Sequence, residues 1–417
     1  MARTAAILPP GPRLTDYISL GVLTTNFPIE LVREVLRQTG RESQRERDLP
    51  AHVMVYYAIA LALYADVSTR EVLRCLLEGA RWLGEPAAAG EPPGKAAISQ
   101  ARTRLGAEPL EALYRAAVEP IGNAATRGVW YRGWRIMSLD GTTLDVADTS
   151  DNARAFGRHS SSRGANATAA FPQLRLLGLV ETGTHVICGA QIGAYRSSER
   201  SLAPAVIARL SSDQLCLADR GFLSFDLWRS ARATGAALAW RAPDSFDLPV
   251  QESLSDGSYR SILNPTHRSR SAERTPVPVR VIRYALPNAP KSEAEYRLVT
   301  SVLEPERAPA AELAALYHER WEIENSFDEF KTHLKGAGRI LRSKTPDLVR
   351  QEVWGFLLAH AAIRSLMHEA ALGSWPQTRD PDTLSFTHAL RVSRRTLPHQ
   401  AAIPPSAPGA RSPRDPK

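Results

Sequence analysis

The sequence has few cysteines and no long apolar segment. Only Cys75, Cys188 and Cys216 occur in 417 residues, an odd and widely spaced set that provides neither a disulfide framework nor a CxxC metal knuckle. The longest apolar run, 53–65, is shorter than the about 20 residues that cross a membrane. The N-terminus also lacks the continuous apolar stretch of a signal peptide. We therefore expect a protein of the reducing cytoplasm that makes no contact with a membrane.

Nucleotide-binding and hydrolase motifs are missing as well. The chain contains no GxGxxG, GxxxxGKS/T, HExxH or GxSxG pattern, so we expect no nucleotide cofactor. Its composition is that of a globular protein, with 43% hydrophobic and 23% charged residues, which excludes wholesale disorder. The net charge of +8 favours a polyanionic partner, although an excess of this size could equally serve solubility.

Hydrophobic periodicity divides the chain into a helical part and a mixed part. Residues 13 to about 85 repeat apolar side chains at helical spacing, with Pro28 at one first turn and Ser68 and Glu71 as a capping box for another. From Trp130 the period shortens, and RIMSLDGTTLDVAD predicts a β-hairpin that turns at its Asp-Gly pair. Four further strands are predicted, with a helix at 224–234 before the last: LRLLGLVET, HVICGAQIGAY, LCLA and ALAWR. These elements predict an α/β core with a mixed sheet.

The chain returns to helix after a strand-rich interruption. Residues 243–305 are rich in Pro and Ser and contain short β-type runs without a helical stripe, which indicates a β-rich insertion. Helices are predicted from about Pro309 to Leu334 and from Pro346 to about Ala371. Roughly the last fifteen residues carry several prolines and are expected to be disordered.

Three acidic residues stand at positions suited to metal binding. Asp140 follows the apolar segment RIMSL, Asp219 follows LCLA, and Glu324 lies on a long amphipathic helix. Carboxylates at the ends of adjacent strands point into the crevice of an open α/β sheet, and a carboxylate from a helix across that crevice would complete a cluster. Oxygen ligands of this kind suit Mg²⁺ or Mn²⁺.

Each of these acids also has an ordinary structural explanation. Asp140 before a glycine could be a turn former, and Asp219 could simply end a strand. Glu324 lies four residues after Arg320, where a surface ion pair would contribute little. Two neighbouring acids could take the role of Asp140: Asp145 and Asp148.

The helix that carries Glu324 has an unusual polar stripe. Five residues step by three and four positions along one face: Tyr317, Arg320, Glu324, Phe327 and Lys331. An ordinary amphipathic helix would present apolar residues on so regular a stripe. The mixture of an acid, two bases and two aromatics therefore indicates a catalytic surface with phosphate contacts beside it.

Three motifs in this chain resemble those of one family. The segment YHERWEIENSFDEFK, residues 317–331, resembles the signature of the bacterial insertion-sequence-four family of DDE transposases. SLDGT around Asp140 and LADRGFLSF around Asp219 resemble the family's first and second acidic motifs, in the correct order. The stretch from TTNFPIELV to AIALALY is similar to the N-terminal domain of one branch of that family.

The resemblance implies an RNase-H-like core that holds two divalent ions, Mg²⁺ or Mn²⁺, on Asp140, Asp219 and Glu324. The ions would activate water, or a freed 3′-hydroxyl, for in-line attack on a DNA phosphodiester without a covalent protein intermediate. The family pattern also implies DNA contacts by three residues of the stripe: Tyr317, Arg320 and Lys331.

Further DNA contacts are expected from three places. Members of the family that cut through a DNA hairpin stack a flipped base on an aromatic residue, and Tyr296 occupies that position here, although cross-strand packing explains it as well. A Ser/Gly/Arg-rich loop, 157–168, is suited to backbone contacts. Basic residues cluster after Glu324 and are expected to hold phosphates rather than only to complement a helix dipole: Lys331, Lys335, Arg339, Arg342 and Lys344.

The expected fold class is α/β: an RNase-H-like mixed-sheet core interrupted by a β-rich insertion, with an α-helical N-terminal domain. Five parts are expected: a helical DNA-binding domain at 1–125, the first part of the catalytic core at 126–242, the insertion at 243–308, the catalytic and C-terminal helices at 309–373, and a partly disordered tail at 374–417.

The expected function is that of a bacterial insertion-sequence transposase. It would cut double-stranded DNA at terminal inverted repeats and transfer the 3′ ends into target DNA by a cut-and-paste route. A homodimer is expected in the DNA complex, because strand transfer needs paired ends, and DNA would hold the protein on the nucleoid. Two alternatives stay open: an RNase-H-like metal nuclease that cuts without joining, and an inactive DNA-binding protein.

Overall fold

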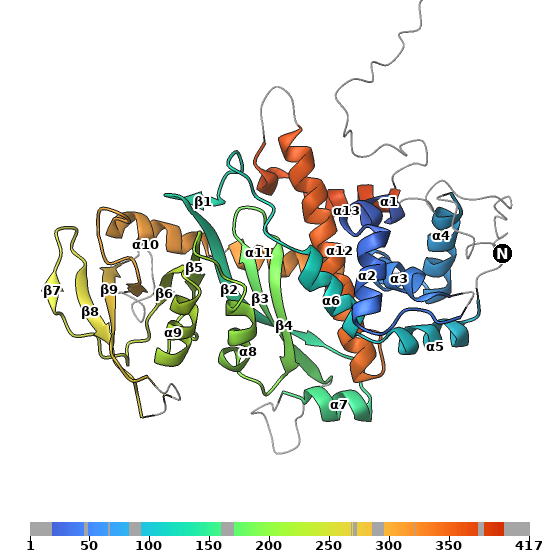
Figure 1. The fold of residues 1–417 in the computed structure, drawn as a ribbon, viewed down its shortest axis with the longest axis horizontal. Helices are drawn as coiled ribbons and strands as arrows, with labels where there is room; N and C mark the ends of the chain where they lie inside the picture. Colours follow the sequence, from blue (N-terminus) through green and yellow to red (C-terminus); the bar gives the residue numbers. More distant parts are fainter. Residues whose placement is uncertain are drawn as a thin grey trace, which may run out of the picture.

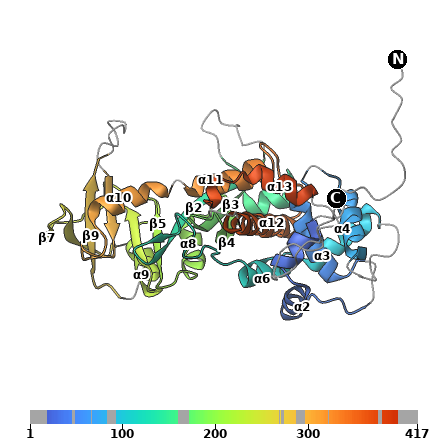
Figure 2. The same cartoon turned by 90° about the horizontal axis from the view of Figure 1, so that it is seen from above.

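The computed structural model describes most of the chain: residues 19–45, 49–65, 67–82, 93–159, 171–267, 269, 273–285, 296–320, 322–373 and 379–395. A helical bundle lies at one end of an elongated molecule and a large sheet at the other (Figures 1 and 2). The disorder expected at the end of the tail and most of the Ser/Gly/Arg-rich loop lie outside the described residues. Within them, no helix is both long and apolar enough to cross a membrane.

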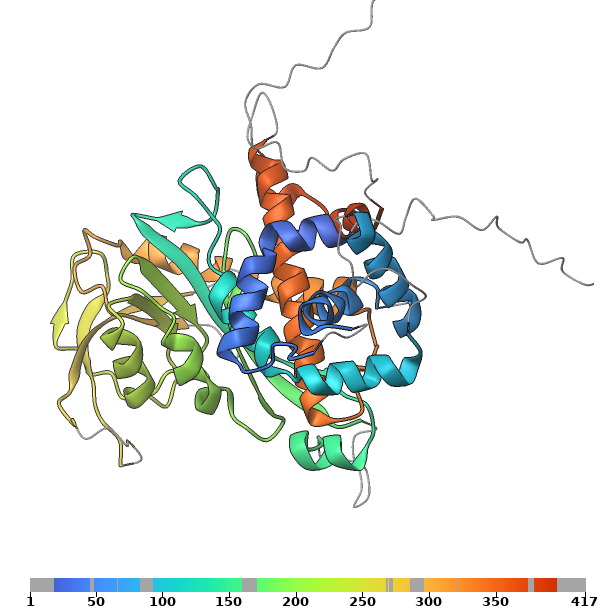
Figure 3. The same cartoon turned by 45° about the vertical axis from the view of Figure 1, so that its right-hand side comes forward.

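Six described helices form the N-terminal part: α1 (Ser19–Asn26), α2 (Ile29–Gln38), α3 (Ala51–Leu63), α4 (Thr69–Trp82), α5 (Lys95–Leu105) and α6 (Glu108–Ala117). Their starts follow the sequence signals, since Pro28 precedes α2 and the Glu71 N–H donates to the Ser68 hydroxyl at 3.3 Å. Helix α3 is almost entirely buried because other helices surround it, and α12 (Pro346–Leu372) packs along it. Figure 3 shows the blue N-terminal helices gathered around the orange α12.

A mixed sheet with the strand order β4-β3-β2-β5-β6 forms the core. Strands β2, β3 and β4 pair antiparallel, whereas β5 and β6 run parallel to β2. This order and these directions are those of an RNase-H-like core, so the predicted fold class is confirmed. The strands, with a short β1 that pairs with β2, are β1 (Trp130–Tyr131), β2 (Trp134–Asp145), β3 (Gln173–Glu181), β4 (Ile187–Ala194), β5 (Gln214–Ala218) and β6 (Ala237–Arg241).

The hairpin predicted at Asp140 is wrong. Strand β2 runs through the Asp-Gly pair as one strand of 12 residues, because β3 pairs with it from Met137 to Asp145. Strand β5 pairs with β2 only as far as Leu139. On that side, no described strand pairs with residues 140–145 of β2. Asp140 therefore lies at an open strand edge and not in a turn.

The predicted β-rich insertion extends the core sheet. Its strands add to the edge of β6 in the order β6-β10-β9-β8-β7, and β10 pairs antiparallel with β6 (Figure 1, yellow strands). Arg280 is fully buried there, where it binds Asp256 and donates to the Ala308 carbonyl at 2.7 Å. The strands are β7 (Glu252–Ser253), β8 (Tyr259–Leu263), β9 (Val277–Tyr284) and β10 (Tyr296–Thr300).

Helices cover both faces of the core sheet. Helix α8 (Glu199–Ile207) covers one face, where Leu202 contacts β4, and α9 (Phe225–Ala233) connects β5 to β6. Helix α11 (Glu322–Asp328) covers the other face, where Phe327 packs over Gly178, the β3 partner of Asp140. Because successive strand residues point to opposite faces, Asp140 faces α11 and the next residue faces α8.

The single helix predicted from Pro309 to Leu334 is divided into α10 (Ala310–Glu319), α11 and the π-helix η4 (Glu329–Leu334). The wider turn of η4 is evident from the hydrogen bond between the Lys335 N–H and the Phe330 carbonyl, five residues earlier, at 3.0 Å. Helix α12 spans its predicted range to within one residue. The remaining elements are α7 (Ser150–Phe156), the 3-10 turn η5 (Pro381–Thr383) and α13 (Phe386–Arg395), which packs on α12 within the expected tail.

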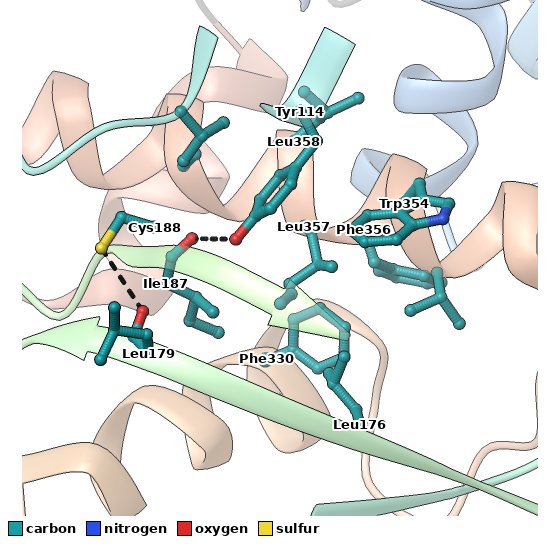
Figure 4. Close-up of a cluster of buried hydrophobic side chains, with 14 of the residues drawn as sticks. Tyr114, Leu176, Leu179, Ile187, Cys188, Phe330, Trp354, Phe356, Leu357 and Leu358 are labelled. Atoms are coloured by element: carbon teal, nitrogen blue, oxygen red, sulfur yellow. Dashed lines mark hydrogen bonds between the residues drawn. The ribbon is translucent and has the colours of Figure 1, made fainter. Parts of the chain in front are cut away.

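The bundle and the sheet share one apolar core (Figure 4). Tyr114 of α6 reaches β4, where its hydroxyl donates to the Ile187 carbonyl at 2.6 Å, and its ring packs beside Trp354 of α12. Phe330 of η4 packs against Phe356 of α12. Since this core joins α12, η4 and the sheet, it fixes the polar stripe relative to the strands.

Candidate active site

Asp140 and Asp219 lie side by side at the open edge of β2. The last paired residues of the parallel strands β2 and β5 are opposite each other, and each is followed by an aspartate. The Gly141 N–H donates to Asp140 Oδ1 and the Gly221 N–H donates to Asp219 Oδ1, both at 2.8 Å. These bonds fix two carboxylates next to each other, an arrangement of oxygen donors that fits Mg²⁺ or Mn²⁺.

Arg320 neutralises part of this negative charge. Its Nη1 donates to Asp140 Oδ2 at 3.0 Å, and both side chains are largely buried. Tyr317, at the previous turn, is buried, and its hydroxyl donates at 3.3 Å to the carbonyl of Ala218, the residue before Asp219. These two residues of the polar stripe therefore contact β2 and β5.

The surroundings of Asp140 disfavour its ionised form. Burial raises the pKa of Asp140 above its ordinary value, the Gly141 N–H and Arg320 oppose that shift, and the charge of Asp219 adds to it. A cation beside the two aspartates would favour the ionised form of both carboxylates.

Glu324 lies on α11, and its side chain is exposed. Its neighbours along the stripe contact the face of the sheet that carries Asp140, since Arg320 binds Asp140 and Phe327 packs over β3. The carboxylate oxygens of Asp140, Asp219 and Glu324 do not all lie within 4.8 Å of one another, and Glu324 forms no hydrogen bond or ion pair with a described residue. The three acids thus do not form a preformed cluster.

Lys331 extends the stripe along β2. Its Nζ donates to Thr142 Oγ1 at 3.1 Å. Thr142 points to the same face of the sheet as Asp140, two residues earlier. Although the helix is interrupted after α10 and widens in η4, Arg320, Phe327 and Lys331 therefore still contact one face of the sheet.

The structure adds an acid that sequence analysis missed. Glu199, the first residue of α8, reaches β2 from the opposite face and lies against Gly141, and Arg175 of β3 donates to its carboxylate at 2.6 Å. Burial raises the pKa of Glu199, Arg175 lowers it, and the charges of Asp140 and Asp219 raise it further. No motif or spacing in the sequence connects Glu199 to the two aspartates, because the proximity arises from the sheet.

The basic residues predicted to hold DNA differ in their surroundings. Lys335 is buried, and its ammonium group donates to two main-chain carbonyls of the following turn. Arg342 donates to main-chain carbonyls at and beyond the end of α3, at 3.0 and 3.1 Å. Arg339 and Lys344 are exposed. The geometry favours structural roles for Lys335 and Arg342, and DNA contact by these residues stays a prediction.

Tyr296 packs inside the extended sheet. It lies opposite Tyr284 in the pairing of β10 with β9, and the two rings stack with centroids 5.4 Å apart. The Arg241 guanidinium lies 4.2 Å from the Tyr296 ring centroid, and the side chain is buried. This arrangement agrees with cross-strand packing. Stacking of Tyr296 on a flipped base stays a prediction, and it would require one of these contacts to open.

A second polar cluster, the anchoring cluster, joins η4 to α12 and consists of Glu329, Arg364, His360 and His185. Glu329 of η4 binds Arg364 and lies 3.3 Å from His360 Nε2, both on α12, and His185 after β3 joins them. Burial by itself raises the pKa of Glu329, but hydrogen bonds with His185 and His360 and the charge of Arg364 hold it well below its ordinary value. The cluster therefore stabilises an ionised carboxylate beneath the polar stripe.

Part of the same cluster has the spacing of metal ligands. His185, Glu322 and Asp382 each offer a donor atom within 4.8 Å of the others, the only such set among the described residues. Arg364 already brings positive charge there, because it binds Glu329 and hydrogen-bonds to His185. The acids of this cluster are thus neutralised by the protein itself, as in a buried ion-pair network.

Two family descriptions match most of the chain. Residues 17–115 match the family described as insertion element 4 transposase N-terminal. Residues 132–362 match the family described as transposase DDE domain. The second match alone covers more than half of the chain and contains Asp140, Asp219 and Glu324.

Relatives with similar sequences occur in Escherichia coli (strain K12). Transposase InsG for insertion sequence element IS4 is 28% identical over 386 residues, which make up 91% of this chain and 83% of that protein. Putative transposase InsZ is 25% identical over 225 residues, or 54% of this chain and 72% of that protein. Among solved structures, a chain of the piggyBac transposase synaptic complex with hairpin DNA aligns with a TM-score of 0.47 and 11% identity, over 91% of this chain and 79% of that chain.

Proposed function

Because the chain belongs to the transposases with a DDE domain and an insertion-element-4 N-terminal domain, we propose that it cuts the terminal inverted repeats of an insertion sequence and joins the 3′ ends to target DNA by cut-and-paste. Transposition of insertion-sequence DNA, by metal-dependent cleavage and strand transfer, is the activity of the family. The observation that supports the site is the adjacency of Asp140 and Asp219 at the ends of two parallel strands, beside Arg320.

In this proposal, two divalent cations, Mg²⁺ or Mn²⁺, are held by Asp140, Asp219 and Glu324. When bound, such ions polarise the scissile phosphate and activate the attacking water or 3′-hydroxyl. Backbone N–H groups fix both aspartates in advance. Glu324 has no described partner to give up, so its exposed carboxylate can turn toward them when DNA is in place.

Arg320 has two competing partners in this scheme. In the protein alone its guanidinium binds Asp140, whereas bound DNA offers a phosphate that can accept two parallel hydrogen bonds. Transfer of Arg320 to the phosphate frees Asp140 Oδ2 for a cation, so DNA binding and metal binding favour each other. A DNA backbone that follows the stripe would pass Tyr317, Arg320 and Lys331 in turn.

The partner in this proposal is double-stranded DNA, held by a homodimer that pairs two transposon ends in the bacterial cytoplasm. Strand transfer of both ends into one target requires that the ends be brought together. The net charge of +8 supports a polyanionic partner.

Joining of DNA ends distinguishes this function from the two alternatives. The purified protein is incubated with Mg²⁺, a duplex that carries the element's end and a supercoiled target plasmid. A transposase gives end-plasmid joints, a nuclease gives cut ends alone, and an inactive binding protein gives neither. A second reaction supplies an end that is already cleaved and carries a free 3′-hydroxyl. Failure to join this end to the plasmid, while uncut ends are still cleaved, would contradict the proposal.

A further inference from the structure

Glu199 approaches the active-site strand from the face opposite to α11. Ser198 caps α8, so Glu199 lies at the positive N-terminal end of that helix. Its carboxylate lies against Gly141, where an added methyl group would meet Glu199 Cδ at 2.6 Å. The Gly141 backbone is not left-handed, so the glycine provides space for this carboxylate and is not required by its conformation.

The next residue connects the same helix to the loop after Asp219. Arg200 Nε donates to the Gly221 carbonyl, and the Gly221 N–H donates to Asp219. The first two residues of α8 therefore contact both of the strand ends that carry active-site aspartates.

At the open edge of β2, side chains from the two faces of the sheet can approach each other. Because β5 ends opposite Leu139, no described strand separates the faces beside Asp140 and Gly141. Asp140 reaches this edge from the α11 side and Glu199 from the α8 side. Their charges interact, since Asp140 and Asp219 each add to the rise in the pKa of Glu199 that burial begins and Arg175 opposes.

We propose that Glu199 is a fourth carboxylate of the metal site: its oxygens do not all lie within 4.8 Å of those of Asp140 and Asp219, so it reaches the cation from the α8 side through a water. This inference rests on the proposed function, because it assumes that the two aspartates bind the cation. It gives the site a third acid that is held in place before DNA arrives, whereas Glu324 is exposed. Arg175, which hydrogen-bonds to Glu199, is a positioning residue.

Two substitutions separate the charge of Glu199 from its position. Glu199→Gln removes the charge and keeps the shape, while Gly141→Ala keeps the charge and displaces the carboxylate by steric contact. Mn²⁺ binding to the full chain without DNA is measured from the electron paramagnetic resonance signal of free Mn²⁺. The Mn²⁺ dependence of end cleavage is measured on the same proteins. Glu119→Gln changes an exposed acid on another part of the surface and is the matched control.

We expect both substitutions to weaken Mn²⁺ binding about tenfold or more, with Glu119→Gln unchanged. Unchanged Mn²⁺ affinity in Glu199→Gln, while Asp219→Asn loses binding, would overturn the role of Glu199 and leave the proposed function standing. A loss of thermal stability without a change in Mn²⁺ affinity would make Glu199 only the ion-pair partner of Arg175, and would also overturn it. Unchanged binding and cleavage in Asp219→Asn would overturn the proposed function itself.

Discussion

Two acidic clusters border the same helical segment, and they balance their charge differently. In the candidate active site, Arg320 is the one cation among the described residues that hydrogen-bonds to Asp140, and burial raises the pKa of that acid. In the anchoring cluster, Arg364 and two histidines surround Glu329 and its pKa falls. The pair of aspartates thus lacks the cationic partners that surround Glu329, and we propose that a metal ion supplies the missing positive charge.

The largest expected effect is a loss of end cleavage when one of the two strand-end aspartates is replaced. Asp219→Asn removes a strand-end carboxylate and should lower end cleavage on the order of a thousandfold or more, because the cation loses a ligand. DNA binding, measured by gel shift, and the circular dichroism spectrum should persist. Asp244→Asn, at an exposed site outside the cluster, is the control and should cleave normally. Normal cleavage by Asp219→Asn would remove the contrast between the two clusters.

The anchoring cluster should respond in stability. Glu329→Gln removes the carboxylate that binds Arg364 most closely and that also contacts His360 and His185, so the free energy of unfolding in urea should fall by about 3–5 kcal/mol. Glu322→Gln, which removes a partly exposed acid from the same cluster, should cost much less. Equal losses for the two variants would show that Glu329 does not hold the cluster together.

The same carboxylate predicts a pH dependence of stability. The pKa of Glu329 is lowered in the folded protein, so its contribution is complete above the ordinary value of 4.5 and is lost as the pH falls below it. Burial raises the pKa of Asp382 to about 6. Protonation of Asp382 therefore favours the folded protein, and it occurs at higher pH than protonation of Glu329. Below about pH 4.5, the melting temperature of the wild type should therefore fall more steeply with decreasing pH than that of Glu329→Gln. The same dependence of melting temperature on pH in the wild type and in Glu329→Gln would contradict a lowered pKa for Glu329.

Arg320 should act in opposite directions on metal binding and on cleavage. Arg320→Gln removes the competitor for Asp140 Oδ2, so Mn²⁺ affinity without DNA should rise about threefold to tenfold. End cleavage should nevertheless fall, because the phosphate loses its guanidinium partner. A fall in both quantities would mean that Arg320 supports the metal site and does not compete with it.

The smallest effect is expected from single phosphate contacts. Lys331→Gln should reduce the slope of log DNA affinity against log salt by about one, since Lys331 lies on the polar stripe beside β2 and is half-buried. Arg342→Gln is the matched comparison, because its guanidinium is bound to main-chain carbonyls near the end of α3. It should lower stability and leave the slope unchanged. A reduced slope in Arg342→Gln alone would reverse these assignments.

Local patterns in the sequence were sufficient to predict several elements and the polar stripe. The strand at 237–241 and helix α12 follow directly from apolar runs and helix-start signals. The stripe that contains Arg320 and Lys331 follows from helical spacing, and it survives the interruption of the helix because its side chains contact one face of the sheet.

Features that depend on distant residues were not predictable in this way. The Asp140–Gly141 pair has the composition of a turn, but pairing with Gly178 and Leu177 of β3, far along the sequence, keeps it extended. Glu199 comes close to β2 only through the packing of α8 on the sheet. The docking of Arg342 on the N-terminal helices likewise depends on a contact between segments far apart in the chain.

Iron-dependent cleavage of the polypeptide tests most directly whether the cation binds at the open edge of β2. Fe²⁺ replaces Mg²⁺ in the full chain, ascorbate and peroxide generate hydroxyl radicals at the bound ion, and mass spectrometry maps the cut sites. The account predicts cuts near Asp140 and Asp219 that disappear in Asp219→Asn. Cuts near His185 and Asp382, with none at the two aspartates, would contradict it and assign the metal to the anchoring cluster.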